Sequence, residues 1–125
     1  MTTMTTYYSS TVSEVGADAA DMLDGGVAIF FGTGCPPALA EVSIVHRADT
    51  ELHRDPRPGD VLRVGDTAVE LTRVGERAGE NLRTLGHIVV YTDPEPGTSL
   101  LPGAVHATGR LAVPEPGAVI LLEGE

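Results

Sequence analysis

Residues 58–75 read PGDVLRVGDTAVELTRVG, and this stretch predicts the class of the fold. Pro58 and Gly59 suit the two central positions of a type II turn, because the second position needs a positive φ. Two valine-containing segments follow the turn. In the second, polar and apolar residues alternate between faces, with Ala68, Glu70 and Thr72 on one side and Val69, Leu71 and Arg73 on the other. Such alternation is typical of a β-strand.

The same turn chemistry recurs along the chain. Pro102-Gly103 and Pro116-Gly117 precede the apolar runs AVHATG and AVILLEG. Further strands are predicted over 6–16, 26–32, 41–48 and 87–92, and the run GVAIFFG (26–32) is expected to be fully buried. Short helices are predicted over 17–26 and 77–86, ending at Gly25 and Gly86, and 33–41 suggests a turn with one helical turn.

These segments predict an all-β fold with a single domain over residues 1–125. About seven or eight short strands and two short helices favour a small barrel or sandwich. Residues 1–6 are expected to form a loose N-terminal tail. An apolar strand such as GVAIFF at an exposed sheet edge would favour a homodimer.

Charge narrows the classes of partner. The formal net charge is −10, and all eight basic residues are arginines. This composition argues against nucleic-acid binding, which needs clustered positive charge, and the absence of lysine excludes Schiff-base chemistry. The acidic surface either aids solubility or speeds the encounter with a basic protein.

The compartment is predicted to be the cytoplasm. The N-terminus has no basic segment followed by an apolar one, so it does not read as a signal peptide, and GVAIFF is too short for a membrane helix. A lone cysteine, Cys35, cannot form an internal disulfide, and we assign it no catalytic role.

Four histidines carry most of the chemical interest, since the common catalytic motifs are absent from the sequence. His53 lies in a polar loop and is expected to be solvated. His46 shares the strand parity of Val42 and Ile44 and should point to the buried side. His87 follows Gly86 at the start of a strand, and His106 lies among small residues. Each could be an ordinary core histidine; together they could bind zinc, but their spacing carries no metal-ligand signature, so no metal is predicted.

Four blocks, in order along the chain, resemble a known family. They are EVGADAADML (14–23), SIVH (43–46), GENLRTLGHIVV (79–90) and LPGAVHATG (101–109). Over about residues 7–122 the chain is similar to the glucitol/sorbitol-specific enzyme IIA component of the bacterial phosphoenolpyruvate-dependent sugar phosphotransferase system (PTS). The resemblance implies a cytoplasmic, barrel-like phosphotransferase component, with His46 as the residue that carries phosphate.

The implied reaction needs no cofactor. The resemblance implies that phospho-HPr donates the phosphoryl group to His46, and that a cysteine of the IIB component of the IIB/IIC permease accepts it. A neutral imidazole can accept phosphate on its free nitrogen, so one nitrogen of His46 is expected to be open to solvent. Arg47 could stabilise the transferring charge if the strand ends or bulges at His46, and otherwise is a solvated charge. His87 and His106 either line the same pocket or are structural.

Two other readings of the sequence stay open. The chain could be a regulatory phosphohistidine domain that serves no transporter, or a small β-barrel that binds a metal ion or another ligand through its histidines. The loop after His46, RADTELHRDPRPGD (47–60), is richer in arginine and aspartate than expected for the family and borders the predicted site.

Overall fold

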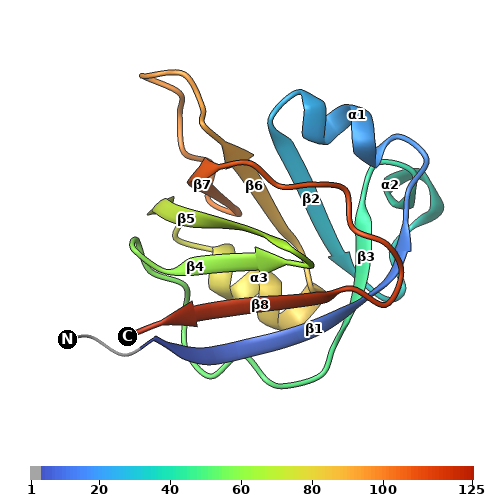
Figure 1. The fold of residues 1–125 in the computed structure, drawn as a ribbon, viewed down its shortest axis with the longest axis horizontal. Coiled ribbons are helices and arrows are strands. Elements are labelled where there is room, and N and C mark those ends of the chain that lie inside the picture. Colours follow the sequence, from blue (N-terminus) through green and yellow to red (C-terminus); the bar gives the residue numbers. More distant parts are fainter. Residues whose placement is uncertain (1–3) are drawn as a thin grey trace.

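Eight strands close into a barrel in the computed structural model, which describes residues 4–125 (Figure 1). The strands are β1 Thr5–Val15, β2 Val27–Gly32, β3 Ile44–Ala48, β4 Val61–Val64, β5 Thr67–Val74, β6 Ile88–Thr92, β7 Ala104–Gly109 and β8 Val119–Gly124. Their order around the barrel is β1-β3-β2-β6-β7-β5-β4-β8. Neighbours pair antiparallel, except that β2–β3 and β6–β7 are parallel. The prediction of an all-β barrel is confirmed.

Three short helices lie between the strands: α1 Ala19–Asp24, α2 Pro37–Ala40 and α3 Ala78–Leu85. The two longer ones match the predicted helices, and α2 is the single helical turn expected after Gly34. None of the helices in residues 4–125 has the length and apolar character needed to cross a membrane. Thr5 and Thr6 belong to β1, so the expected loose tail is wrong for these two residues; residues 1–3 of that tail lie outside the described residues.

The predicted turns are correct at two of three places. Gly59 and Gly117 have φ of 95° and 93°, as a type II turn requires. Gly103 does not have a positive φ, so the type II prediction is wrong there. A Cβ at position 103 would lie 2.9 Å from Asn81 Nδ2, so a larger residue there would require the Asn81 side chain to shift.

The apolar core fills the inside of the barrel. Large side chains from several strands meet there, among them Val12, Phe30, Ile44, Leu71 and Val105. Strand β2 contributes only alternate residues to this core, so the expectation that β2 is fully buried is wrong: Ala28 and Phe30 are buried, and the other four residues of the strand are half-buried. Because β2 pairs with β3 on one side and β6 on the other, it has no free edge, and the edge-based reason for a homodimer is removed.

The barrel consists of two halves with the same topology. From β2, the strands in one direction around the barrel are β3, β1 and β8; from β6, the strands in the other direction are β7, β5 and β4. Strands β1 to β4 therefore correspond to β5 to β8 about a pseudo-two-fold axis. Both halves also bulge at one place: Val12 pairs with His46 just before the irregularity in β1, and Leu71 pairs with Ala107 just before the irregularity in β5.

Backbone hydrogen bonds fix the equivalent positions. Gly16 N–H donates to the Ser43 carbonyl (2.9 Å), and Gly75 N–H donates to the Ala104 carbonyl (2.8 Å). Three residues beyond Ser43 and Ala104 lie His46 and Ala107, the same equivalence that the bulges give.

Helices α1 and α3 also begin at equivalent positions in the two halves. Ala19 N–H donates to the Gly16 carbonyl and Ala78 N–H to the Gly75 carbonyl, both at 3.1 Å, so α1 and α3 begin at equivalent points. Counting from Ala19 and Ala78 makes Asp24 of α1 equivalent to Arg83 of α3. A glycine with a positive φ follows α1 after one intervening residue (Gly26, 85°) and follows α3 directly (Gly86, 67°), so the two halves differ by one residue at this turn.

Candidate active site

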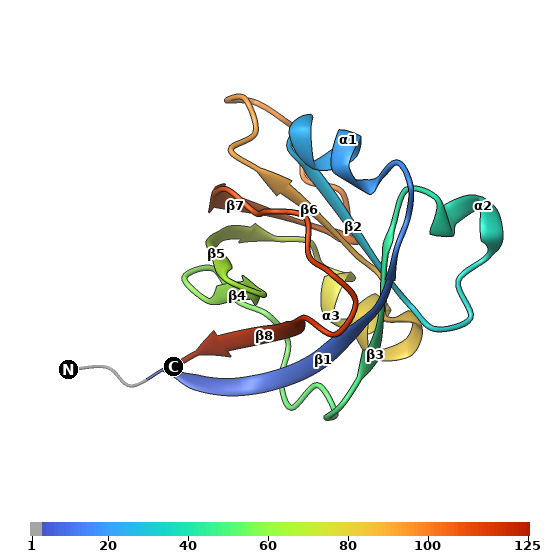
Figure 2. The ribbon, with the colours of Figure 1, turned by 45° about the vertical axis from the view of Figure 1, so that its right-hand side comes forward.

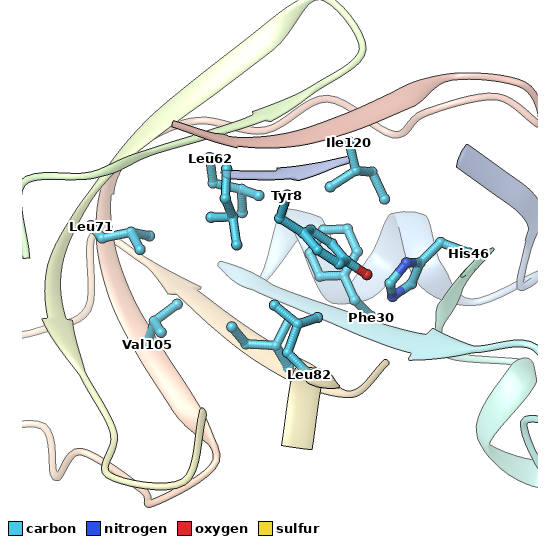
Figure 3. Close-up of a pocket in the computed structure, with 10 residues that line it drawn as sticks. Tyr8, Phe30, His46, Leu62, Leu71, Leu82, Val105 and Ile120 are labelled. Atoms are coloured by element: carbon cyan, nitrogen blue, oxygen red, sulfur yellow. The ribbon is translucent and has the colours of Figure 1, made fainter. Parts of the chain in front are cut away.

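His46 lies at one end of the barrel interior, with its ring turned inward from β3. The residue is 2% exposed. The rings of Tyr8 and Phe30 approach it edge-on, with centroids 6.5 Å and 6.2 Å away, and Figure 3 shows the Tyr8 hydroxyl directed toward the imidazole. The inward direction follows from strand parity with Ile44, as the sequence predicted.

Both ring nitrogens of His46 have hydrogen-bond partners. Nδ1 lies 2.9 Å from the Ser10 hydroxyl, and Nε2 lies 2.7 Å from the Gly86 carbonyl. Because a carbonyl oxygen can only accept, Nε2 carries the proton and Nδ1 accepts from Ser10. The expectation of a nitrogen open to solvent is therefore wrong for this structure. The cause is the left-handed turn at Gly86, which directs its carbonyl at the ring.

The surroundings keep His46 neutral. Burial lowers the pKa of the His46 imidazole below its ordinary value of 6.5, and the hydrogen bond to Gly86 opposes this only in part. The uncharged ring is the form that has a nitrogen lone pair for attack on phosphorus.

A polar depression lies on the solvent side of His46. It has a volume of about 190 Å³ and is lined by residues of β3, α3 and the turn at Gly86, including Arg47 and Arg83. Gly86, the partner of Nε2, lines this depression, whereas Ser10, the partner of Nδ1, is 0% exposed and does not line it. Nε2 is therefore the nitrogen nearer the depression. On its inner side the ring contacts the apolar barrel interior, lined by side chains such as Leu62, Leu82 and Ile120 (Figure 3).

Arg47 shares the depression with His46, although β3 neither ends nor bulges at His46. The strand continues to Ala48, and the irregularity lies on the partner strand, between Val12 and Glu14. Arg47 is exposed on the outer side of β3 and reaches the depression at its rim.

His87 and His106 do not join His46 in one pocket. His87 follows Gly86 directly, but its ring packs 5.0 Å from the ring of Phe31, and burial lowers its pKa. His106 lines a separate pocket under the 93–98 loop. The physical reason is parity: Val105 and Ala107 point into the core, so His106 between them points outward. Of the two readings left open for these histidines, the shared pocket does not hold for His106.

The zinc alternative fails on the same geometry. His46 faces the barrel interior and His106 faces outward from β7, so the histidines do not converge. Within residues 4–125 there is no group of three or more His, Cys, Asp or Glu side chains placed to hold a metal ion. His53 is exposed in its loop, as expected.

Three groups that surround His46 were not predicted from the sequence: the Ser10 hydroxyl, the Gly86 carbonyl and Arg83. Ser10 occupies an inward position of β1 between Tyr8 and Val12. A polar serine among inward-facing apolar residues is the sequence feature that could have indicated a buried hydrogen-bond partner. The Gly86 carbonyl had no sequence signal beyond the helix-ending glycine. Arg83 lies in the GENLRTLGHIVV block, but only the fold brings it to the depression.

The loop after β3 is tied to the barrel by a buried carboxylate. Asp60 accepts hydrogen bonds from the Tyr7 hydroxyl (2.7 Å), from Arg54 (2.9 and 3.1 Å) and from the Arg57 N–H (2.9 Å). Burial alone would raise the pKa of Asp60, but these donors outweigh it and lower the pKa. The same loop carries Asp55, which therefore lies on an anchored segment.

Comparison with known proteins agrees with the geometry. The family model described as "PTS system glucitol/sorbitol-specific IIA component" matches residues 7–120. The glucitol/sorbitol-specific EIIA components of Shigella flexneri and Escherichia coli K12 are each 35% identical over 123 residues, covering 96% of this chain and 97% of theirs. The crystal structure of a PTS system IIA component from Enterococcus faecalis V583 superposes with a TM-score of 0.81 at 25% identity, covering 90% of this chain and 96% of that one. The chain belongs to the family of PTS glucitol/sorbitol-specific IIA components.

Proposed function

We propose that His46 is the phosphoryl-carrying residue of this PTS component, which takes a phosphoryl group from phospho-HPr and passes it to a cysteine of a IIB component during glucitol or sorbitol uptake. The proposal places the protein in the cytoplasm, where its partners meet it. The observation that carries the proposal is the neutral imidazole whose Nε2 adjoins a depression containing two arginines. The net charge of −10 would speed the encounter with a basic carrier protein.

The pseudo-two-fold axis argues that the imidazole is not needed for the scaffold. The equivalent position in the second half is Ala107, which is 0% exposed and packs in the core. The second half packs correctly with the small Ala107 side chain at this position. The histidine in the first half is therefore better explained by chemistry than by packing.

Transfer requires the Gly86 carbonyl to withdraw from Nε2. The proton then has to reside on Nδ1 so that Nε2 presents its lone pair. Ser10 suits both states, because its hydroxyl donates to Nδ1 in this structure and can accept from a protonated Nδ1 after the change. The Nε2–P bond forms as the N–P bond of the donor histidine breaks, and the electron pair of that bond returns to the donor imidazole.

The structure described above is therefore the closed form of the site in this proposal. The Gly86 turn is suited to the movement, since glycine adopts both signs of φ with little cost and Leu85 beside it is exposed. A docked partner that contacts Leu85 could open the turn.

The test is phosphorylation with phosphoenolpyruvate, enzyme I and HPr, followed by mass spectrometry under conditions that preserve acid-labile phosphate. We expect one labile phosphate on His46. His46→Ala should abolish it, and His53→Ala and His106→Ala should retain it. Labelling that persists in His46→Ala would refute the assignment. Transfer from the labelled protein to a IIB domain tests the transport role: its failure would favour a regulatory domain.

A further inference from the structure

We propose that Arg83 of α3 binds the phosphoryl oxygens during transfer to His46, and that Asp55 holds Arg83 in position before phosphate arrives. This inference rests on the function proposed above. Arg83 lines the depression beside His46 and lies three residues before Gly86, the residue whose carbonyl covers Nε2. A phosphoryl group on Nε2 would enter that depression.

The position of Arg83 is set by a specific contact. Its Nη2 lies 3.1 Å from Asp55 Oδ1. Asp55 itself packs over Gly79, one helical turn before Arg83, and a Cβ at position 79 would collide with the Asp55 carboxylate. Gly79 therefore leaves room for Asp55 beside α3, where the Asp55 carboxylate accepts a hydrogen bond from the Arg83 guanidinium.

This ion pair can be exchanged for phosphate. The side chains of Arg83 and Asp55 are 49% and 70% exposed, and solvent-exposed pairs of this kind contribute little to stability. A phosphoryl group carries more negative charge than a carboxylate and offers several acceptor oxygens. The planar guanidinium can bind two of them at once, and its charge counters the negative charge on the transferring group.

The two halves of the barrel provide an internal comparison. Counted from the helix starts, the position equivalent to Arg83 is Asp24, and the position equivalent to His46 is Ala107. Next to Ala107 stands Thr108, where the first half has Arg47. The site of the imidazole thus combines Arg47 from its own half with Arg83 from the other half, whereas the symmetry-related positions around Ala107 hold Thr108 and Asp24. The scaffold does not require an arginine there.

Arg77 provides a matched control. It belongs to the same chain segment, at the N-terminal cap of α3, and its nearest carboxylate is Glu80 at 3.8 Å, in a pair that is also exposed. Arg77 does not line the depression. Replacing Arg77 or Arg83 with alanine removes one exposed arginine in each case.

The experiment measures the single-turnover rate of phosphorylation by phospho-HPr and the lifetime of the phosphate on His46. We expect Arg83→Ala to slow transfer by about 100-fold, the loss typical of removing one donor to a developing anion. Arg83→Lys should lie between wild type and Arg83→Ala, because lysine keeps the charge but not the planar fork. Arg77→Ala should stay within about twofold of wild type.

Asp55→Ala separates a phosphate role from a structural one. If Arg83 acts only by pairing with Asp55, the two alanine variants should be equally impaired. Under the proposal, Asp55→Ala keeps the guanidinium and should lose far less than Arg83→Ala. Equal impairment, or an Arg83→Ala rate within about twofold of Arg77→Ala, would overturn the inference. Failure of the wild type to become phosphorylated would overturn the proposed function itself. Thermal unfolding of each variant checks that the barrel is intact, and Arg83→Lys provides the folded comparison if Arg83→Ala is not.

Discussion

At the residue scale, the two partners of His46 differ in what they permit. The Ser10 hydroxyl can donate or accept, so it is compatible with either neutral tautomer of the ring. The Gly86 carbonyl only accepts, so it is compatible only with a protonated Nε2. In the proposed mechanism, the Gly86 carbonyl therefore controls whether Nε2 is free to react, and Ser10 keeps the imidazole oriented in both tautomers.

Burial of His46 predicts a dependence of stability on pH. The pKa of the imidazole is lowered in the folded protein relative to the ordinary 6.5, so below pH 6.5 the unfolded chain binds more protons than the folded one. The stabilisation is complete above pH 6.5 and is lost as the pH falls toward the lowered folded pKa. We expect the free energy of unfolding in urea to decrease from pH 7 to pH 5.

His46→Gln should flatten that decrease, since glutamine does not titrate. The pKa of His87 is lowered in the same direction, so part of the slope should survive in His46→Gln and disappear only when His87→Gln is added. An unchanged pH slope in His46→Gln would show that the ring is not held neutral by burial.

At the element scale, the carbonyl group in the turn after α3 has a different hydrogen-bond partner from the one in the turn after α1. Gly86 and Gly26 both have a positive φ. The Gly26 carbonyl accepts from the Thr92 N–H at 2.9 Å, which belongs to the strand framework, whereas the Gly86 carbonyl accepts from His46. The same turn thus bonds to the strand framework in one half and covers Nε2 of His46 in the other.

Alanine substitutions at the two glycines should separate these uses. Each variant should lose about 1–2 kcal/mol of unfolding free energy, because alanine resists a positive φ. Gly86→Ala should lose more, since its Cβ would lie 2.7 Å from the backbone of Gly32, compared with 3.2 Å from the Thr92 carbonyl oxygen for Gly26→Ala. Only Gly86→Ala should change the phosphorylation rate of His46. Equal rates in both variants would contradict a gating role for the Gly86 turn.

At the scale of the whole molecule, local patterns predicted most of the elements. Alternation identified β5, a terminal glycine marked the end of α3, and proline-glycine pairs marked the turns before β4 and β8. Strand parity placed His46 on the inner face and, by the same logic, would have placed His106 on the outer face between Val105 and Ala107. These features depend on residues that are close together in the sequence, so they can be predicted from one sequence alone.

Closure of the barrel and the cover over His46 were not predictable in this way. The Gly86 carbonyl and Ser10 lie 40 and 36 residues from His46, and their approach depends on strand pairing across the barrel. The repeat of the two halves was also missed. Its only clear sequence trace is VGADA at 15–19 and VGERA at 74–78, too short to establish a repeat without the matching backbone hydrogen bonds.

Because the start of β1 and the end of β8 are neighbours, the order of the two halves along the chain can be exchanged by circular permutation. Thr5 pairs with Gly124, and Figures 1 and 2 show the start of β1 beside the end of β8. A circular permutant that joins residue 125 to residue 4 through a short linker and opens at Gly65–Asp66 would be synthesised with the histidine-bearing half last. We expect it to close into the same barrel and to accept phosphate on the same imidazole. Circular dichroism and the labelling assay would check this, and a folded but unlabelled permutant would mean that the site depends on chain continuity between β4 and β5.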